Sequence, residues 1–175
     1  EQYYRDCRIH PIHEGTTGIQ GMDLLGRKVI MKNSQALIHY VEEVESTIAA
    51  AKAYNELAPF ADRLKAALDR LQEVTRHLLS LAQSEGPEVF LSDATLYLEL
   101  FGLVTISWQW LLQGIAVQKA LSEGVKKKDQ DFYAGKMYAL RYFYGYELTK
   151  MEGLARRLTD TDRVTVEMPA ASFND

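Results

Sequence analysis

The stretch LAPFADRLKAALDRLQEVTRHLLSL, residues 57–81, decides the fold class of this chain. Leucine recurs at every seventh position, and a second apolar residue follows each leucine after three positions. The two sets are Leu57, Leu64, Leu71 and Leu78, and Phe60, Ala67, Val74 and Leu81. Such a repeat over four heptads is typical of a long helix that pairs with another helix in a left-handed supercoil. The partner helix lies either in the same chain or in another subunit.

The ends of this helix can also be placed. Pro59 is tolerated only in the first turn of a helix, so the helix starts close to it, and Gly86-Pro87 ends it. Three further long helices are predicted by their apolar periodicity at about 34–54, 92–121 and 131–158.

Each of the three has a distinguishing feature. Asn33 or Ser34 can cap the helix over 34–54. The helix over 92–121 is apolar on most faces, and we expect it to be the central, most buried one. The helix over 131–158 carries an aromatic stripe, which favours a role in the core and in a subunit interface over a ligand pocket.

The chain is therefore expected to be all-α, an antiparallel bundle of about four long helices with a short helical segment before it and an irregular tail after it. Short connections near Asn55, Gly86 and Gly124 favour antiparallel neighbours. In the tail, residues 159–175, Val164 and Val166 alternate with polar residues, which predicts a short extended segment.

Composition excludes some classes of partner. The formal net charge of −4 over 175 residues gives no support for nucleic-acid binding. Cys7 is the single cysteine, so no internal disulfide is possible, and we expect it to be a small buried thiol. Residues 94–117 are long enough to span a bilayer, but Glu99 and two glutamines within them favour a buried bundle helix, and no membrane span is expected.

The densest chemistry lies in IHPIHEGTTGIQ, residues 9–20. The simplest interpretation is a turn followed by a helix capped by Thr16 or Thr17, with Gly21 and Gly26 present for close packing. A metal site would use His10, His13 and Glu14, but two histidines and one glutamate without a further ligand are weak evidence.

A third interpretation makes Glu14 a general base. The N–H groups around Gly15 to Gly18 could face a phosphate or a polarised carbonyl. An apolar ligand that covered the Glu14 carboxylate would raise its pKa from about 4.3 toward neutrality. The carboxylate could then accept a weakly acidic C–H proton.

The stretch YRDCRIHPIHEGTTGIQGMDLLGRKV, residues 4–29, resembles a signature near the end of the catalytic region of acyl-CoA dehydrogenases. In that signature an arginine–aspartate pair leads to a glutamate-glycine-threonine turn, then to Ile-Gln and a final helix. The matching residues are Arg5-Asp6, Ile9, Glu14-Gly15-Thr16 and Ile19-Gln20. The helical remainder is similar to the C-terminal extension of one branch of this family.

The resemblance implies a reaction. The glutamate at the position of Glu14 abstracts the α-proton of an acyl-CoA thioester, and a hydride leaves the β-carbon for N5 of FAD, which yields a trans-2-enoyl-CoA. The backbone N–H of Glu14 helps to polarise the thioester carbonyl, and Gly15 contacts the substrate. The residues implied in FAD binding are Thr16, Thr17 and Gly18.

Two positions depart from the family pattern. His13 stands where an aromatic residue is common, and Gly18 stands where a longer polar residue is common. Because glycine has no side chain, only the backbone of Gly18 can contact FAD.

The resemblance also implies an organisation. Residues 1–32 would end the catalytic helical domain, residues 33–158 would form a helical bundle extension, and 159–175 a tail. The chain would be the C-terminal part of a longer enzyme, inactive alone. Acyl-CoA, an electron-transfer flavoprotein and further copies of the chain would be its partners, in the cytoplasm of a bacterium or a mitochondrial matrix. A free-standing helical assembly module without catalysis is the alternative.

Overall fold

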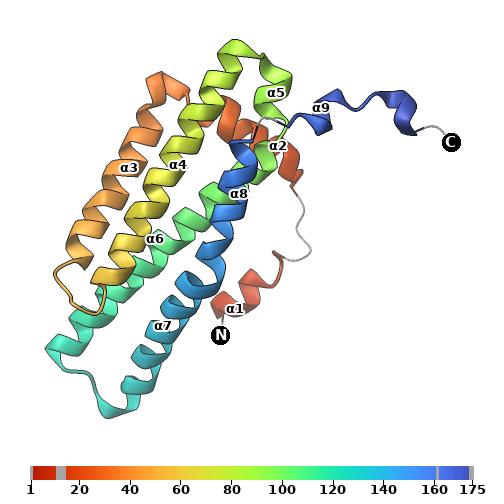
Figure 1. Cartoon of the computed structure of the whole chain (residues 1–175). Coiled ribbons are helices and arrows are strands. Elements are labelled where there is room, and N and C mark those ends of the chain that lie inside the picture. Colours follow the sequence, from red (N-terminus) through yellow and green to blue (C-terminus); the bar gives the residue numbers. More distant parts are fainter. Residues whose placement is uncertain (1, 11–14, 161, 174–175) are drawn as a thin grey trace.

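The computed structural model describes residues 2–10, 15–160 and 162–173. Over these ranges the chain forms helices and connecting turns and no strand, which confirms the all-α prediction (Figure 1). The long helical elements are α3 (Met31–Ala51), α4 (Ala58–Ser84), α6 (Ala94–Glu123), and a rod made of α7 (Gln130–Tyr142), the π-helix Phe143–Glu147, the 3-10 turn Leu148–Lys150 and α8 (Met151–Leu158).

Shorter elements precede, connect and follow the long ones. They are α1 (Gln2–Cys7), α2 (Thr17–Asp23) with the π-helix Leu24–Lys28 that continues it, α5 (Pro87–Leu91), the 3-10 turn Lys127–Asp129, α9 (Val164–Glu167) and the 3-10 turn Ala170–Phe173. α1 and the segment after α9 extend away from the bundle, whereas α9 itself lies beside α2 and α5 (Figure 1).

The predicted limits of α4 are confirmed, because Pro59 lies in its first turn and the helix ends just before Gly86. The seam leucines of α4 are buried, from Leu57 and Leu64 at 0% exposure to Leu78 at 4%. They face helices of the same chain, since α4 packs against α3, α6 and α8. The heptad repeat thus has its partners inside the chain.

The prediction that the helix after residue 92 is central is also confirmed. α6 packs against α2, α3, α4, α7 and α8. One side of it is fully buried, including Leu100, Val104 and Leu111. Among the described residues, α6 is the helix that is long and apolar enough to cross a membrane by length and composition alone, a test that the core helix of a bundle also passes.

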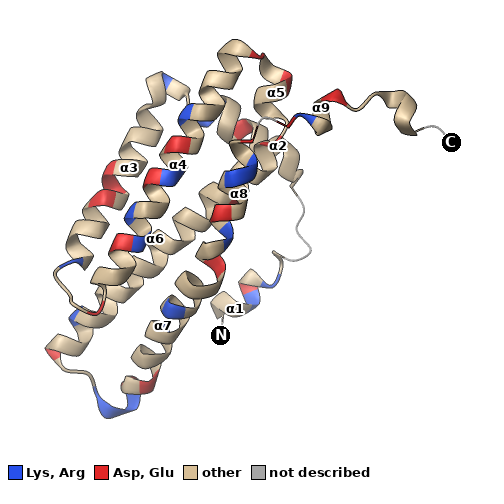
Figure 2. Ribbon diagram, viewed as in Figure 1, with Lys and Arg blue, Asp and Glu red and all other residues tan. Residues whose placement is uncertain are grey.

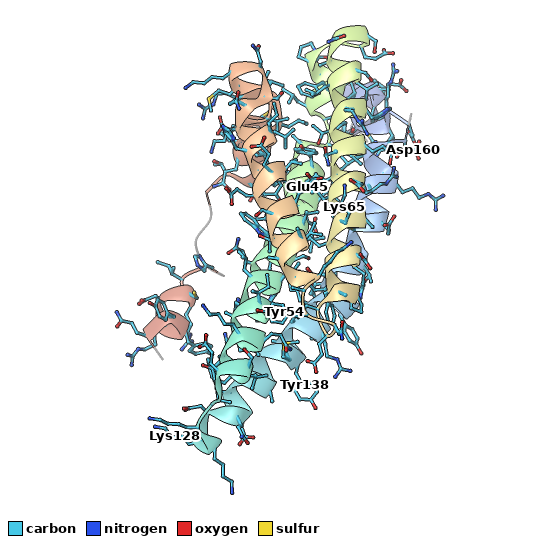
Figure 3. The ribbon with its side chains drawn as sticks, turned by 90° about the vertical axis from the view of Figure 1, so that its left-hand side faces the viewer. Glu45, Tyr54, Lys65, Lys128, Tyr138 and Asp160 are labelled. Carbon is cyan, nitrogen blue, oxygen red and sulfur yellow. The ribbon has the colours of Figure 1, made fainter. Side chains whose placement is uncertain are left out.

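Ion pairs on the outer surface join neighbouring helices of the bundle. Lys65 on α4 contacts Glu45 on α3 at 3.4 Å, and Lys52, just after α3, contacts Asp62 at 2.9 Å. Figure 2 shows acidic and basic residues facing each other along these two helices, and Figure 3 shows Glu45 and Lys65 directed toward one another. These pairs are exposed, so each contributes little to stability.

The rod after residue 130 contains a π-helix that brings Tyr144 into the core. Tyr144 is completely buried, and its hydroxyl donates to the carbonyl of Ser107 on α6 at 2.9 Å. A π-helix leaves a carbonyl without its usual i+4 partner. Here Arg63 on α4 donates to the carbonyl of Tyr144. The sequence predicted one regular helix over this span and did not indicate the interruption.

One end of the bundle follows the prediction, and the tail departs from it. Lys32, Asn33 and Ser34 all have positive φ, between 50° and 62°, so the regular part of α3 begins after Ser34, as predicted. The tail forms one helical turn at α9 instead of the expected extended segment. Short-range hydrogen bonds account for that turn, because the carboxylate of Asp162 accepts the N–H of Val164 at 3.0 Å.

Candidate functional site

The structure describes only part of the stretch 9–20. His13 and Glu14 lie outside the described residues, so the predictions that rest on them remain predictions. The described part is the turn from Gly15 to Gly18 and the start of α2.

Thr16 shapes this turn. It occupies the N-cap position of α2, as the capped-helix interpretation requires, but in a left-handed conformation with φ 56° and ψ 68°. Its hydroxyl donates to the carbonyl of Gly15 and makes no capping bond. Its own carbonyl accepts the N–H of Gln20 at 3.1 Å. A left-handed threonine is uncommon and costs of order 1–3 kcal/mol, so the rest of the fold must hold it in place.

Glycine residues fix this segment on the bundle. A Cβ on Gly21 would lie 2.6 Å from the carbonyl oxygen of Ala94, at the start of α6. A Cβ on Gly26 would lie 3.3 Å from the side chain of Leu91 on α5. Both contacts confirm the prediction that these glycines are present for close packing. The helix that follows the candidate turn is therefore held directly against the central helix.

Charged side chains lie at the end of α2 and in the π-helix that continues it. Arg27 donates to both carboxylate oxygens of Asp23, and Lys28 approaches the same carboxylate at 3.4 Å. The hydrogen bond from Arg27 lowers the pKa of the Asp23 carboxyl below its usual value. The lowered pKa makes the Asp23 carboxylate a weak proton acceptor, so Asp23 is unsuited to act as a base.

The turn offers polar, uncharged groups for a cofactor. Thr16, Thr17 and Gly18 are all exposed, and a Cβ on Gly18 would meet no atom within 4 Å. A flat or bulky group can therefore approach the Gly18 backbone closely. Backbone N–H groups at the start of a helix fit acceptor atoms on the carbonyl and nitrogen edge of a flavin. The predicted FAD-binding residues thus have the accessibility and the backbone donors that such a contact needs.

The metal interpretation stays a hypothesis, because two of its three residues, His13 and Glu14, lie outside the described part of the chain. The described residues themselves contain no group of three or more His, Cys, Asp or Glu arranged to hold an ion. The expectation that Cys7 is buried is wrong. Cys7 is exposed at the end of α1, because no residue of that helix is buried against the bundle.

A second polar cluster lies near the C-terminal end of α4, beside the start of α6, and no pattern in the sequence points to it. A cavity of about 40 Å³ is lined by His77, Phe90, Asp93, Arg157 and Arg163, among others. The Nε2 atom of His77 is buried there without a hydrogen-bond partner, and Arg157 pairs with Asp93 at 2.9 Å. The volume suits a single water molecule. No spacing in the sequence indicates this cluster, because its members come from three separate segments.

Comparison with known proteins gives one family and several relatives. The family model described as acetyl-CoA dehydrogenase C-terminal like matches residues 40–169. The 3-methylmercaptopropionyl-CoA dehydrogenase of Ruegeria pomeroyi is 32% identical over 168 residues, which cover 91% of this chain and 27% of that protein.

Two further relatives are more distant. The broad-specificity linear acyl-CoA dehydrogenase FadE5 of Mycobacterium tuberculosis is 25% identical, over 99% of this chain and 29% of its own length. A butyryl-CoA dehydrogenase of Syntrophomonas wolfei is 26% identical, over 97% of this chain and 28% of its own. The chain thus spans little more than a quarter of the length of the curated relatives that it matches.

Proposed function

The chain belongs to the acyl-CoA dehydrogenase C-terminal family, and on that premise we propose that it is the C-terminal part of an FAD-dependent acyl-CoA dehydrogenase, which converts an acyl-CoA thioester into the trans-2-enoyl-CoA. The observation that carries the proposal is the extent of the alignment. The mycobacterial relative, an acyl-CoA dehydrogenase by name, aligns with 99% of this chain, so the alignment includes the turn that follows Glu14.

Glu14 is the proposed base. Its carboxylate takes the α-proton of the thioester while the Cα–Cβ double bond forms. Apolar cover by the acyl chain would raise the carboxyl pKa and so match it to this weak carbon acid. The backbone N–H of Glu14 donates to the thioester carbonyl, whose oxygen gains negative charge as the proton leaves. FAD, when bound, supplies the acceptor for the hydride that leaves the β-carbon.

The neighbouring residues position the reactants. Gly15 is half-buried and carries no side chain, so the thioester can approach the backbone there. Thr16, Thr17 and Gly18 are proposed to contact FAD. The packing of Gly21 on Ala94 supports this role, because it ties α2 to the central helix and limits the freedom of the turn before it.

The proposal extends to partners. Acyl-CoA is the substrate, an electron-transfer flavoprotein is the electron acceptor, and the chain associates with further copies of itself. The place of action is the bacterial cytoplasm or, in a eukaryote, the mitochondrial matrix. The 175-residue chain alone is expected to be inactive.

The test is rapid-mixing reduction of bound FAD by an acyl-CoA, in a polypeptide of the relatives' length that carries this chain. Glu14→Gln keeps the side-chain shape and removes the proton acceptor, so we expect flavin reduction to slow by about 10⁴-fold or more with acyl-CoA binding retained. Glu43→Gln, on the exposed face of α3, is the matched control and should reduce FAD at the wild-type rate. Equal rates in Glu14→Gln and wild type would remove Glu14 from the role of base.

An assembly module without catalysis is the second candidate. The exposed aromatic residues of the α7–α8 rod support it, because they suit an interface and such a role needs no catalytic residue in the chain. A full-length protein that binds no flavin would favour this candidate over the first.

A further inference from the structure

The outward face of the α7–α8 rod exposes large aromatic side chains. Tyr138, Tyr142 and Tyr146 lie on this face and are 67%, 56% and 66% exposed. Figure 3 shows Tyr138 on the α7 part of the rod, toward the end of the bundle that carries Lys128. Tyrosine is enriched where protein surfaces meet, and one stripe of three on a single helix face is more than scattered surface residues supply.

Glycines share the same face. Gly135, Gly145 and Gly153 are exposed, and a Cβ on any of them would meet no atom within 4 Å. The fold of the chain therefore gives no packing reason for these three glycines. Each costs about 1 kcal/mol relative to alanine inside a helix. A neighbouring molecule that approaches the rod closely would explain them.

The face is complementary to itself in one antiparallel register, with a twofold axis between residues 143 and 144. In that register the bulky Tyr142 lies opposite Gly145 of the second copy, and Tyr138 lies opposite Thr149. All four positions are exposed. Large side chains thus meet small ones along the centre of the face, as close helix packing requires.

The same register matches charges at its ends. Asp131 lies opposite Arg156 of the second copy, so an acid meets a base at both ends of the pair, and both residues are exposed. Arg141 lies opposite Tyr146, whose ring face attracts a guanidinium. A parallel arrangement would place each of these residues against its own copy, with like charges together.

The side chains of the face are already ordered within one chain. Tyr142 and Tyr146 stack with ring centroids 4.8 Å apart, and the Arg141 guanidinium lies 5.6 Å from the centre of the Tyr138 ring. Because these contacts already order the side chains in one chain, less conformational entropy is lost when two chains associate.

We infer that two copies of this chain pair antiparallel through the α7–α8 face, with Tyr142 of each copy seated over Gly145 of the other. The inference rests on the homo-oligomer in the proposed function. It adds which face of the chain forms the contact, that the two helices run antiparallel, and which residues lie opposite each other. Charge complementarity between Asp131 and Arg156 favours a second copy as the occupant over the preceding part of the same polypeptide.

The first experiment measures the molar mass of the 175-residue chain by size-exclusion chromatography with light scattering. The wild type is expected to dimerise. Gly145→Gln fits the isolated chain, because the space beside Gly145 is open, and should weaken dimerisation at least about 30-fold by filling the seat of Tyr142. Ala49→Gln, on the exposed side of α3, is the matched control and should leave the dimer intact.

The second experiment tests direction and register by oxidative cross-linking in a Cys7→Ser background. Tyr138→Cys with Thr149→Cys should give a covalent dimer, because the two positions face each other across the axis, and Cα atoms must come within about 7 Å for a disulfide. Either cysteine alone should give none, since two copies of one position lie far apart in an antiparallel pair.

The outcomes separate the two claims. A monomeric wild type at high micromolar concentration would overturn both the pairing and the homo-oligomer proposed for this chain. A dimer that tolerates Gly145→Gln and resists the double cross-link would overturn the pairing and leave the homo-oligomer standing. Cross-linking by single cysteines would show a parallel pair. None of these results bears on Glu14.

Discussion

The hydroxyl of Tyr97 on α6 donates to Oγ1 of Thr75 on α4 at 2.8 Å, and Thr75 in turn donates to the carbonyl of Leu71 at 2.7 Å. Both residues are buried, at 0% and 2% exposure. The Thr75 hydroxyl has a single proton, which it donates to Leu71, so the Tyr97 hydroxyl is the donor in the bond between the two side chains. A polar link thus joins the heptad helix to the central helix inside an otherwise apolar core.

Replacing Thr75 by Val should destabilise the chain by about 1–3 kcal/mol, because it leaves the buried Tyr97 hydroxyl without an acceptor. Tyr97→Phe removes the donor and should cost only about 0.5–1.5 kcal/mol. The double variant should cost less than the sum of the two single changes. Chemical denaturation of the four proteins measures this, and strict additivity would show that the two hydroxyls do not interact.

Stability should fall at alkaline pH through Tyr97. Burial raises the pKa of Tyr97 to about 12, from a usual value of 10. A raised pKa means that the folded state disfavours the tyrosinate. The contribution of Tyr97 to the free energy of unfolding is therefore complete below pH 10 and is lost as pH rises through 12. The loss is on the order of 2 kcal/mol.

The measurement for this prediction is the free energy of unfolding between pH 9 and 12. Tyr97→Phe should flatten the curve in part, since burial also raises the pKa of Tyr144 and that contribution remains. An unchanged slope in Tyr97→Phe would contradict the assignment.

Gly21→Ala should destabilise the chain by about 1–3 kcal/mol, because the added methyl would lie 2.6 Å from a backbone oxygen that cannot move without shifting α6. Gly102→Ala is the matched control within α6, where a Cβ meets nothing within 4 Å, and should stabilise the chain by up to about 1 kcal/mol. Thermal unfolding of both variants gives the comparison. Equal effects would mean that α2 does not pack on Ala94 as described.

The ion pair between Asp93 and Arg157 should matter more than the exposed pairs. Arg157→Met leaves the Asp93 carboxylate, whose side chain is 17% exposed, without its partner, and we expect a cost of about 1–3 kcal/mol. Lys65→Met, at an exposed pair with Asp69, should change stability by less than about 1 kcal/mol. Denaturant titrations at low salt compare the two, and a larger effect at Lys65 would refute the ranking.

The sequence predicted the parts of the fold that repeat or end sharply. Short stretches of sequence indicate these parts on their own. They are the heptads around Leu64 and Leu71, the helix start at Pro59 and the apolar span after residue 92. The π-helix at Phe143–Glu147 gives none, because it depends on Arg63 and Ser107 from other helices. The helical turn at α9 rests on the side chain of Asp162, and simple alternation of apolar residues does not reveal such a bond.

The candidate site divides in the same way. The order of residues around Glu14 supplied the hypothesis of a base, and the glycines after it predicted close packing. The left-handed conformation of Thr16 could not be predicted, since threonine has no preference for it. The cavity beside His77 could not be predicted either, because its walls come together only in the folded chain.

The contact of Gly21 with Ala94 has a consequence for the order in which the chain folds. α3 with α4, and α6 with α7, are neighbours in sequence and need only short loops to meet. α2 reaches the start of α6 only after the intervening chain has been brought together, and closing so long a loop costs entropy before any contact repays it. The helical hairpins therefore form first and α2 docks late, so Gly21→Ala should speed unfolding while leaving the folding rate nearly unchanged. Nascent chains would carry a finished bundle for some time before the turn beside Glu14 takes its shape.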